Sequence, residues 1–280
     1  MAALANETVG ARAAPALQAF VPRYRGYRYE GLSPGTHQGV PSGNLTFIVG
    51  LDAPTEITRM PGPQEPGTFH AFVGGLHDTP ATIAHEGFGG GISIDVSPLA
   101  SRAIFGVPAG ELACSVVGLD DLLGRDAVEL SDRVSSAASW PERFDVLDEI
   151  LLRRVSEDRA PSPELRRTWD LLVRSSGQMP VTELASQVGW SRRHLSSRFR
   201  VEFGLAPKAA ARVLRFEQAC SLLDQGMAMA DTAALAGYYD QAHLIHEWRD
   251  LAGVTPTAWQ GDELRDHDAD GVAFSARRVA

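Results

Sequence analysis

Basic side chains gather in one stretch of the chain, between residues 191 and 215. This stretch holds seven basic residues, which are Arg192, Arg193, Arg198, Arg200, Lys208, Arg212 and Arg215. The acidic residue among them is Glu202, so the local net charge is +6. Guanidinium groups pair with phosphate oxygens and can donate two parallel hydrogen bonds to guanine. The stretch therefore indicates either a surface that faces nucleic-acid phosphates or an ordinary solvated helix face.

Two similar segments frame this basic stretch. Glu183–Phe199 reads ELASQVGWSRRHLSSRF, and Asp231–Trp248 reads DTAALAGYYDQAHLIHEW. Gly189 aligns with Gly237, and each copy then reads as a short helix, a glycine-containing turn and a longer helix with apolar residues four apart. This order is typical of a helix-turn-helix unit, whose second helix presents side chains to a DNA major groove. Two copies favour this interpretation over the alternative, the helical core of an enzyme.

These segments extend into a family resemblance. Residues 164–262 resemble the tandem helix-turn-helix DNA-binding domain of the AraC/XylS family of bacterial transcription regulators. The resemblance is carried by VTELASQVGWSRRHLSSRF, by FGLAPKAAARVLRFEQACSLL and by ADTAALAGYYDQAHLIHEWRDLAGVTPTAW. Gly204–Pro207 and Gly253–Pro256 match the repeated helix endings of the family. Two positions depart from it: the family commonly has an aromatic residue where Ala210 stands and a basic residue where His246 stands.

The resemblance implies that two helices, Ser191–Phe203 and Asp240–Leu251, enter successive major grooves about 34 Å apart. It assigns base contacts to Arg193, Ser196 and Ser197 in the first helix and to Gln241, Ala242, Ile245 and His246 in the second. Phosphate contacts are expected from Arg192, Arg198, Arg200 and Arg212. For Arg212 and Arg215 an ion pair with Glu217 or Asp224 inside the domain is the alternative.

The C-terminal third also shows the elements that must position these side chains. Apolar spacing and capping residues predict seven helices. The first begins at Ser162–Pro163 and ends near Gly177, and it is followed by Thr182–Val188, Ser191–Phe203, Pro207–Leu223, Ala230–Ala236, Asp240–Leu251 and a short helix from Thr255. We expect a DNA-binding domain over residues 161–263 and a polar tail over residues 264–280.

The N-terminal part has a different composition. Residues 1–124 contain 19 of the 27 glycines and 11 of the 17 prolines. Short β-type runs lie between the turns, at Asn44–Leu51, Thr68–Val73, Gly91–Val96 and Ala113–Val117. They predict a β-rich, cupin-like barrel or sandwich over residues 1–120, and hence an α+β multidomain chain. Residues 20–124 also resemble, more loosely, the sensor domains of some AraC/XylS members, on RYRGYR, VPSGNLTFIVGL and SPLASRAIFGVPAGEL.

A helical connector is expected over residues 121–160. Asp121–Ala138 reads as one helix, and a second begins at Trp140 and carries an apolar stripe of Phe144, Leu147, Leu151 and Val155. This stripe spans fewer than two heptads, so we expect it to dock onto the N-terminal domain rather than form a coiled coil. Burial between two chains of a dimer is the alternative.

The N-terminal part offers few signs of catalysis. The spacing of His37, His70, His77 and His85 matches no compact metal signature, so no metal and no cofactor are expected. Gly87–Gly91 reads as a flexible turn rather than a phosphate loop, and Cys114 as a buried, inert thiol. The side chains of Tyr24, Arg25, Tyr27, Arg28 and Tyr29 either line a pocket for an anionic ligand or face solvent alternately along a strand.

The charge distribution and the lengths of the apolar runs limit the classes of function that the sequence allows. The overall net charge is −9, but residues 1–150 hold 18 acidic and 9 basic residues while residues 151–280 hold 17 of each. No signal peptide and no apolar run of the ~18 residues needed to span a membrane is apparent, so a cytoplasmic protein without membrane contact is expected. The prediction is a non-enzymatic transcription regulator that binds double-stranded DNA under control of a small-molecule effector or a partner at its N-terminal domain. A homodimer and contact with RNA polymerase are further expectations, and a cupin-like enzyme with a helical accessory domain is the alternative.

Overall fold

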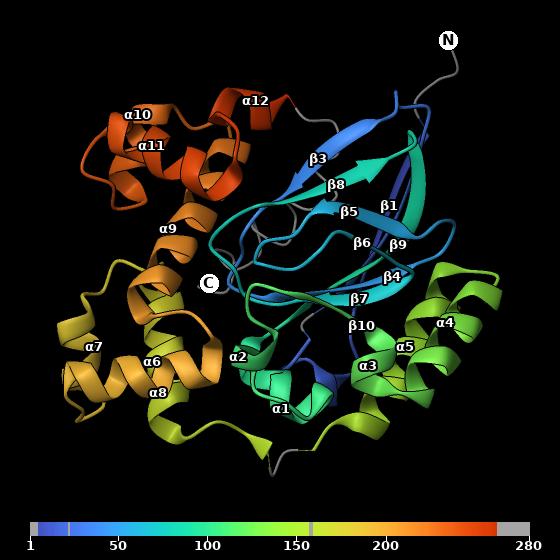
Figure 1. Cartoon of the computed structure of the whole chain (residues 1–280), viewed down its shortest axis with the longest axis horizontal. Helices are drawn as coiled ribbons and strands as arrows, with labels where there is room; N and C mark the ends of the chain where they lie inside the picture. The colour runs from blue at the N-terminus through green and yellow to red at the C-terminus, as the bar shows by residue number, and fades with distance from the viewer. Residues whose placement is uncertain (1–4, 22, 157–158, 262–280) are drawn as a thin grey trace.

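The computed structural model describes residues 5–21, 23–156 and 159–261. Its N-terminal part is a β-sandwich, and its C-terminal part is a group of helices beside one end of that sandwich (Figure 1). The strands are β1 (Ala5–Arg12), β2 (Arg23–Glu30), β3 (Gly35–Gly39), β4 (Leu45–Gly50), β5 (Thr55–Arg59), β6 (Gly67–Phe69), β7 (Ala71–Gly74), β8 (Ala81–His85), β9 (Phe88–Val96) and β10 (Val116–Gly118).

The strands form two antiparallel sheets. One has the order β1-β2-β9-β4-β7-β10 and the other the order β3-β8-β5-β6. Ile48 and Phe72 of the larger sheet pack with Ile57 and Ala81 of the smaller sheet, so the two sheets face each other. The described strands leave the sheets separate rather than closing them into a barrel, which confirms the sandwich form of the predicted β-rich domain.

Alternation along β2 sends its side chains to two different places. Tyr24 faces the helices that cover the outer face of the larger sheet, where it joins the main core. Arg25, Tyr27 and Tyr29 point the other way, into a cavity between the two sheets. Of the five residues that the sequence placed either in a pocket or along a solvent-facing strand, Arg25, Tyr27 and Tyr29 line the cavity, Arg28 is exposed, and Tyr24 is buried in the core.

The predicted connector docks on the sandwich. It consists of α3 (Leu119–Leu123), α4 (Arg125–Ser136) and α5 (Trp140–Arg154), because Gly124 with φ +58° divides the single helix expected over Asp121–Ala138. Phe144 of α5 stacks on Tyr24 at 5.8 Å between ring centroids. The Tyr24 hydroxyl donates to Asp148 Oδ1 at 2.7 Å. The apolar stripe is thus buried within the chain, as expected, although Val155 at its end is only half-buried.

In the described residues up to 261, seven helices follow, in the order expected from apolar spacing. They are α6 (Pro163–Arg174), α7 (Val181–Gln187), α8 (Arg192–Phe203), α9 (Pro207–Asp224), α10 (Met229–Leu235), α11 (Gln241–Ala252) and α12 (Pro256–Gln260). The side chains of Ser162, Ser191, Asp240 and Thr255 accept backbone N–H groups at four of the N-termini. Such caps and the 3.6-residue period are local signals, which is why the boundaries agree with the sequence to within a few residues.

The strands were predicted less completely. The run Thr68–Val73 is divided at His70 into β6 and β7, and the run Ala113–Val117 contributes only Val116 and Val117, because Cys114 adopts φ +54°. Strands β1, β3, β5 and β8 were not expected. In β5 only Ile57 is buried, so the strand lacks the apolar alternation that marks a half-buried strand in sequence.

The prediction that Gly87–Gly91 forms a flexible turn was wrong for most of this run. Gly89, Gly90 and Gly91 belong to β9 and pair with Tyr29, Arg28 and Tyr27 of β2, so this run is not a flexible turn. A Cβ on Gly91 would lie 2.8 Å from the Tyr27 hydroxyl oxygen, and one on Gly89 would lie 2.8 Å from that of Tyr29. The glycines are needed because tyrosine side chains lie across the strand there. Only Gly87, with φ +85°, has the backbone expected of a turn.

Candidate nucleic-acid interface and N-terminal cavity

The first helix-turn-helix unit consists of α7 and α8. Leu195 and Phe199 are fully buried and anchor α8, and Gly189 makes the turn with φ +70°. Phe203, one turn further on, packs on Trp169 of α6 at 4.7 Å between ring centroids. Ser191 caps α8 by accepting the His194 N–H at 3.2 Å. The anchors lie on one side of the helix, so its opposite side, where the sequence predicts contacts with DNA, lies at the surface.

The second unit, α10 and α11, has the same construction. Leu244 and Trp248 are fully buried, and Gly237 makes the turn with φ +78°. Trp248 packs edge-on against Phe216 of α9 at 4.8 Å, and Asp240 caps α11 by accepting the His243 N–H at 2.8 Å. The two units lie at opposite ends of α9, which therefore sets the distance between α8 and α11 (Figure 1).

None of the side chains expected to contact bases is buried. In α8, Arg193 and Ser197 are exposed and Ser196 is half-buried. In α11 the exposed residues are Gln241, Ala242 and His246, and Ile245 is half-buried.

The four expected phosphate contacts divide into two groups. Arg192, Arg198 and Arg200 are exposed. Arg212 of α9 instead donates from Nε to Glu247 Oε1 at 2.9 Å. The structure therefore gives Arg212 an internal partner on α11, Glu247, where the sequence had suggested Glu217 or Asp224.

The ion pairs around Glu247 join α11 to α9. Arg215 lies 3.6 Å from the second carboxylate oxygen of Glu247 and also donates to the Gly177 carbonyl oxygen at 3.2 Å. His246 lies 3.8 Å from Asp250 on the exposed side of α11. The second unit therefore carries carboxylates beside its cationic groups, whereas the first presents exposed arginines.

Tyr239 is an exposed residue that was not among the site residues predicted from the sequence. Tyr239 is the extra residue in the second copy of the turn and is 92% exposed, directly before the Asp240 cap. Its neighbour Tyr238 is buried and packs edge-on against His243, as Trp190 does against His194 in the first unit. The extra residue was visible in the alignment of the two copies, but its exposure was not.

The N-terminal part contacts the far end of α8. Helix α2 (Ala109–Leu112) packs there so closely that a Cβ on Gly110 would lie 2.4 Å from the Val201 carbonyl oxygen. Arg102 of α1 (Ser101–Phe105) donates from Nε and Nη2 to the two carboxylate oxygens of Glu202, at 2.8 and 3.0 Å. Glu202 is 6% exposed, and this contact lies beyond the residues expected to read bases.

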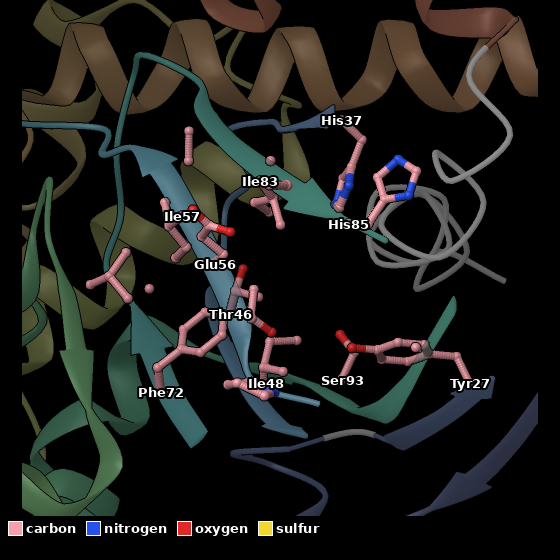
Figure 2. Close-up of a pocket in the computed structure, with 18 of the residues that line it drawn as sticks. Tyr27, His37, Thr46, Ile48, Glu56, Ile57, Phe72, Ile83, His85 and Ser93 are labelled. Carbon is pink, nitrogen blue, oxygen red and sulfur yellow. The ribbon is translucent and has the colours of Figure 1, made fainter. Parts of the chain in front are cut away.

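A cavity of about 220 Å³ lies between the two sheets of the sandwich. Ile57, Phe72 and Ile83 form its apolar part, and Tyr27, His37, His85 and Ser93 lie toward its other end, with Ile48 beside Ser93 (Figure 2). Arg25 also lines it. Tyr24 and Arg28 do not, since Tyr24 is in the main core and Arg28 pairs with Asp52 at 3.0 Å on the outside.

The histidines do not assemble a metal site. The His37 and His85 rings lie 6.0 Å apart, and His77 lines another part of the cavity, where burial lowers its pKa. His70 is absent from the lining. Within the described part of the chain, no three side chains of the kinds that bind metals are grouped closely enough to hold an ion. Cys114 is half-buried rather than buried, and burial raises the pKa of its thiol.

Comparison with known proteins shows which domain family the C-terminal helices resemble. Residues 184–262 match the family described as helix-turn-helix domain. A curated relative, the uncharacterized HTH-type transcriptional regulator YbfI of Bacillus subtilis (strain 168), is 31% identical over 85 residues. That match covers 30% of this chain and 31% of YbfI, so this chain spans about a third of the relative's length.

Solved structures resemble most of this chain in fold. ToxT from Vibrio cholerae matches with a TM-score of 0.52 at 10% identity, over 84% of this chain and 97% of that one. The fatty-acid-bound wild-type ToxT of strain SCE256 matches with a TM-score of 0.53 at 9% identity, over 84% and 94% of the two chains. At such identities the likeness concerns the fold, which is ToxT-like, with N-terminal sheets and C-terminal helix-turn-helix units.

The helices and the matches together define the class: residues 184–262 are an AraC-type helix-turn-helix domain, of the kind found in DNA-binding transcription regulators. Around that domain the chain has the two-domain architecture of ToxT. The predicted AraC-type helix-turn-helix domain is confirmed over residues 184–262. Among the described helices, none has the length and apolar character needed to cross a membrane.

Proposed function

We propose that this protein is a sequence-specific transcription regulator that reads two successive major grooves with α8 and α11. The observation that carries the proposal is the presence of two capped, firmly anchored helices at opposite ends of α9, each with its candidate base-reading side chains at the surface (Figure 1). Units of this kind place their second helix in the groove and read the base edges from it.

The exposed side chains suit different bases. In α8, Arg193 can donate a bidentate pair of hydrogen bonds to guanine, and Ser196 and Ser197 can donate or accept single ones. In α11, Gln241 matches adenine. Apolar contacts of Ala242 or Ile245 suit the thymine methyl group, and His246 supplies one further polar contact.

Backbone contacts follow from the exposed charges. Arg192, Arg198 and Arg200 are free to neutralise phosphates from around α8. For Arg212 we propose a positioning role, because its guanidinium is engaged by Glu247 and so fixes α11 against α9. Tyr239, exposed next to the start of α11, is proposed as an additional contact to the sugar–phosphate backbone through its hydroxyl group.

The N-terminal sandwich is proposed as the regulatory domain. Structures of ToxT have been solved with an unsaturated fatty acid and with a methylnaphthalenyl butenoic acid. The cavity between the two sheets gives this chain a place for a small-molecule effector. The proposed setting is the bacterial cytoplasm, with double-stranded DNA as the main partner and RNA polymerase as the target of regulation. A homodimer would bring two such chains to one operator.

Selection of bound sequences from a random pool of duplex DNA tests the DNA-binding function. The full-length protein should enrich two short elements whose centres are about one helical turn, or 34 Å, apart. A matched variant with Leu195→Asp disrupts the anchoring of α8 and should lose the first element. Recovery of no enriched sequence by the folded full-length protein would overturn the proposal.

A further inference from the structure

Arg25 is a buried cation with an unused donor. It is 8% exposed, and its Nη2 donates to Ser93 Oγ at 3.2 Å. Its Nε finds no hydrogen-bond partner in the described part of the chain. A guanidinium group stays charged in proteins, and a buried charge is unfavourable unless it is paired. An anion that accepts a hydrogen bond from Nε would therefore stabilise this side chain.

The carboxylates that line the cavity leave the Arg25 Nε without a hydrogen-bond partner in the described part of the chain. Glu56 and Glu86 also line it, but both are exposed, and Glu56 belongs to the opposite sheet. Asp95 lies one inward-facing position beyond Ser93 on β9 and has an interaction of its own. Another arginine of β2, Arg28, shows the contrast, because its guanidinium forms two hydrogen bonds to Asp52 outside the cavity.

The rest of the cavity is suited to an apolar group. Ile57 and Phe72 are buried, and with Ile83 they lie away from Ser93, whereas Ile48 lies beside Ser93 on the neighbouring strand (Figure 2). The volume of about 220 Å³ exceeds the ~150 Å³ of a protein cavity that binds benzene. An occupant with a body the size of one ring and a short charged arm, on the order of ten non-hydrogen atoms, fits that space.

We propose that this cavity binds a compact organic carboxylate, with its anionic group on Arg25 and Ser93 and its apolar body against Ile57, Phe72 and Ile83. The planar guanidinium fork matches a carboxylate geometrically, and such charge-assisted hydrogen bonds are strong where water is excluded. The proposal rests on the proposed function only in casting this carboxylate as the effector, since binding itself requires no DNA.

Isothermal titration of the full-length, DNA-free protein at neutral pH tests the proposal. The probes are phenylacetate and hexanoate, their neutral amides phenylacetamide and hexanamide, the long-chain acid palmitoleate, and inorganic phosphate. We expect at least one compact acid to bind ten times more tightly than its amide, than palmitoleate and than phosphate. Arg25→Gln should abolish the preference for acid over amide, whereas Arg28→Gln, on the same strand but outside the cavity, should keep it.

Several outcomes would overturn the proposal. They are the absence of binding by both compact acids, equal binding of acid and amide, tighter binding of palmitoleate or phosphate, and an unchanged preference in a folded Arg25→Gln variant. If Arg25→Gln does not fold, Ile83→Trp fills the apolar end and should weaken the compact acids at least tenfold, and unchanged affinity would contradict the site. Selection from the DNA pool is read separately, so failure of the ligand site is distinguishable from failure of DNA binding.

Discussion

At the scale of residues, the two reader helices carry different chemistry at equivalent positions. When His194 of α8 is aligned with His243 of α11, Arg193 corresponds to Ala242 and Arg198 corresponds to Glu247. Arg198 is exposed, whereas Glu247 is turned toward Arg212. Bidentate contacts discriminate bases better than apolar contacts do, so the first unit should carry most of the sequence information.

Replacement of Arg193 by Ala should flatten the preference at one base pair of the first half-site. The loss of a bidentate contact is worth about 1–3 kcal/mol of discrimination against the wrong base. His246→Ala should instead weaken binding to all sequences by a similar, smaller factor. Binding-site profiles of both variants measure this difference. Equal information in the two half-sites, or a profile unchanged by Arg193→Ala, contradicts the inequality of the readers.

Gly91 should tolerate no side chain. In Gly91→Ala the new methyl group would lie 2.8 Å from both the Val49 carbonyl oxygen and the Tyr27 hydroxyl oxygen. We expect the free energy of unfolding to fall by about 1–3 kcal/mol, as for other overpacked cores. Gly74→Ala, in the same sheet, is the control, because its nearest atoms would lie at 3.8 Å. Urea unfolding of the two variants measures this difference in stability. Equal free energies of unfolding would show that the backbone of β9 shifts to accommodate the methyl group at little cost.

At the scale of elements, α4 and α5 are joined by a network of exposed ion pairs. Arg133 pairs with Glu129 of its own helix and with Glu149 of α5. Arg153 of α5 pairs back to Glu129 at 2.8 Å. The hydrogen bonds from Arg153 and Arg133 lower the pKa of Glu129, and that from Arg133 lowers the pKa of Glu149. The network therefore links the stability of this helix pair to pH.

The sign of that pH dependence follows from the direction of the shifts. A carboxyl group whose pKa is lower in the folded state adds stability above its unfolded pKa and loses it as the pH falls through the folded value. The contribution of Glu129 and Glu149 should therefore be complete at neutral pH and should disappear progressively below the ordinary glutamate pKa of 4.5. Arg133→Met should lower the melting temperature at neutral pH but have little effect in strong acid.

A matched control for this prediction is available on the same helix. Arg125→Met removes an exposed arginine of α4 that contributes to neither glutamate shift. Thermal melts of both variants across the acid range compare them. An Arg133→Met effect as large in strong acid as at neutral pH would show that packing of the arginine stem, and not its charge, holds the helices together.

At the scale of the whole molecule, the two parts of the chain meet at places that bear on DNA binding. Arg102 holds Glu202 at the end of α8, and α2 packs beside it. The wall of the N-terminal cavity also reaches α9, because Ser42 lines the cavity and a Cβ on the adjacent Gly43 would lie 2.6 Å from Leu214. A molecule in the cavity would therefore contact Ser42, whose neighbour Gly43 packs directly on α9, the helix that sets the distance between the two helix-turn-helix units.

Removal of the N-terminal part should leave DNA binding intact. The anchors Phe199 and Phe203 pack on Trp169 within the C-terminal part, so a chain that begins at residue 160 keeps the support of α8. Its affinity should fall with salt, with a log–log slope of about 0.9 per phosphate neutralised. Gel shifts over a salt series measure the slope, and Arg200→Ala should reduce it by about one.

Glu202 provides the control for that fragment. Without Arg102 the carboxylate has no ion pair to lose, so Glu202→Gln should lower the melting temperature of the full chain but have little effect on that of the fragment. A folded fragment that binds no DNA at any salt concentration would show that the N-terminal part is needed to hold the reader helices in place.

The sequence by itself determined the seven C-terminal helices, the two turns and the surface positions of residues such as Arg193 and Gln241. These depend on local signals, since caps, turn glycines and anchors four residues apart act within one or two helical turns. The AraC-type identity of the domain came from the resemblance of these segments to that family, and the match over residues 184–262 agrees with it. The roles of the individual reader side chains stay predictions.

Only the tertiary structure decided which distant residues meet. Arg212 pairs with Glu247 across 35 residues of chain, and Arg102 pairs with Glu202 across 100. Arg25 became a cavity residue, and the glycines beside Tyr27 became part of a strand, because β2 pairs with β9, whose residues lie 58 to 70 positions later in the chain. Such contacts depend on strand register and on the packing of whole elements, and the residues between them carry no local pattern that specifies the partner.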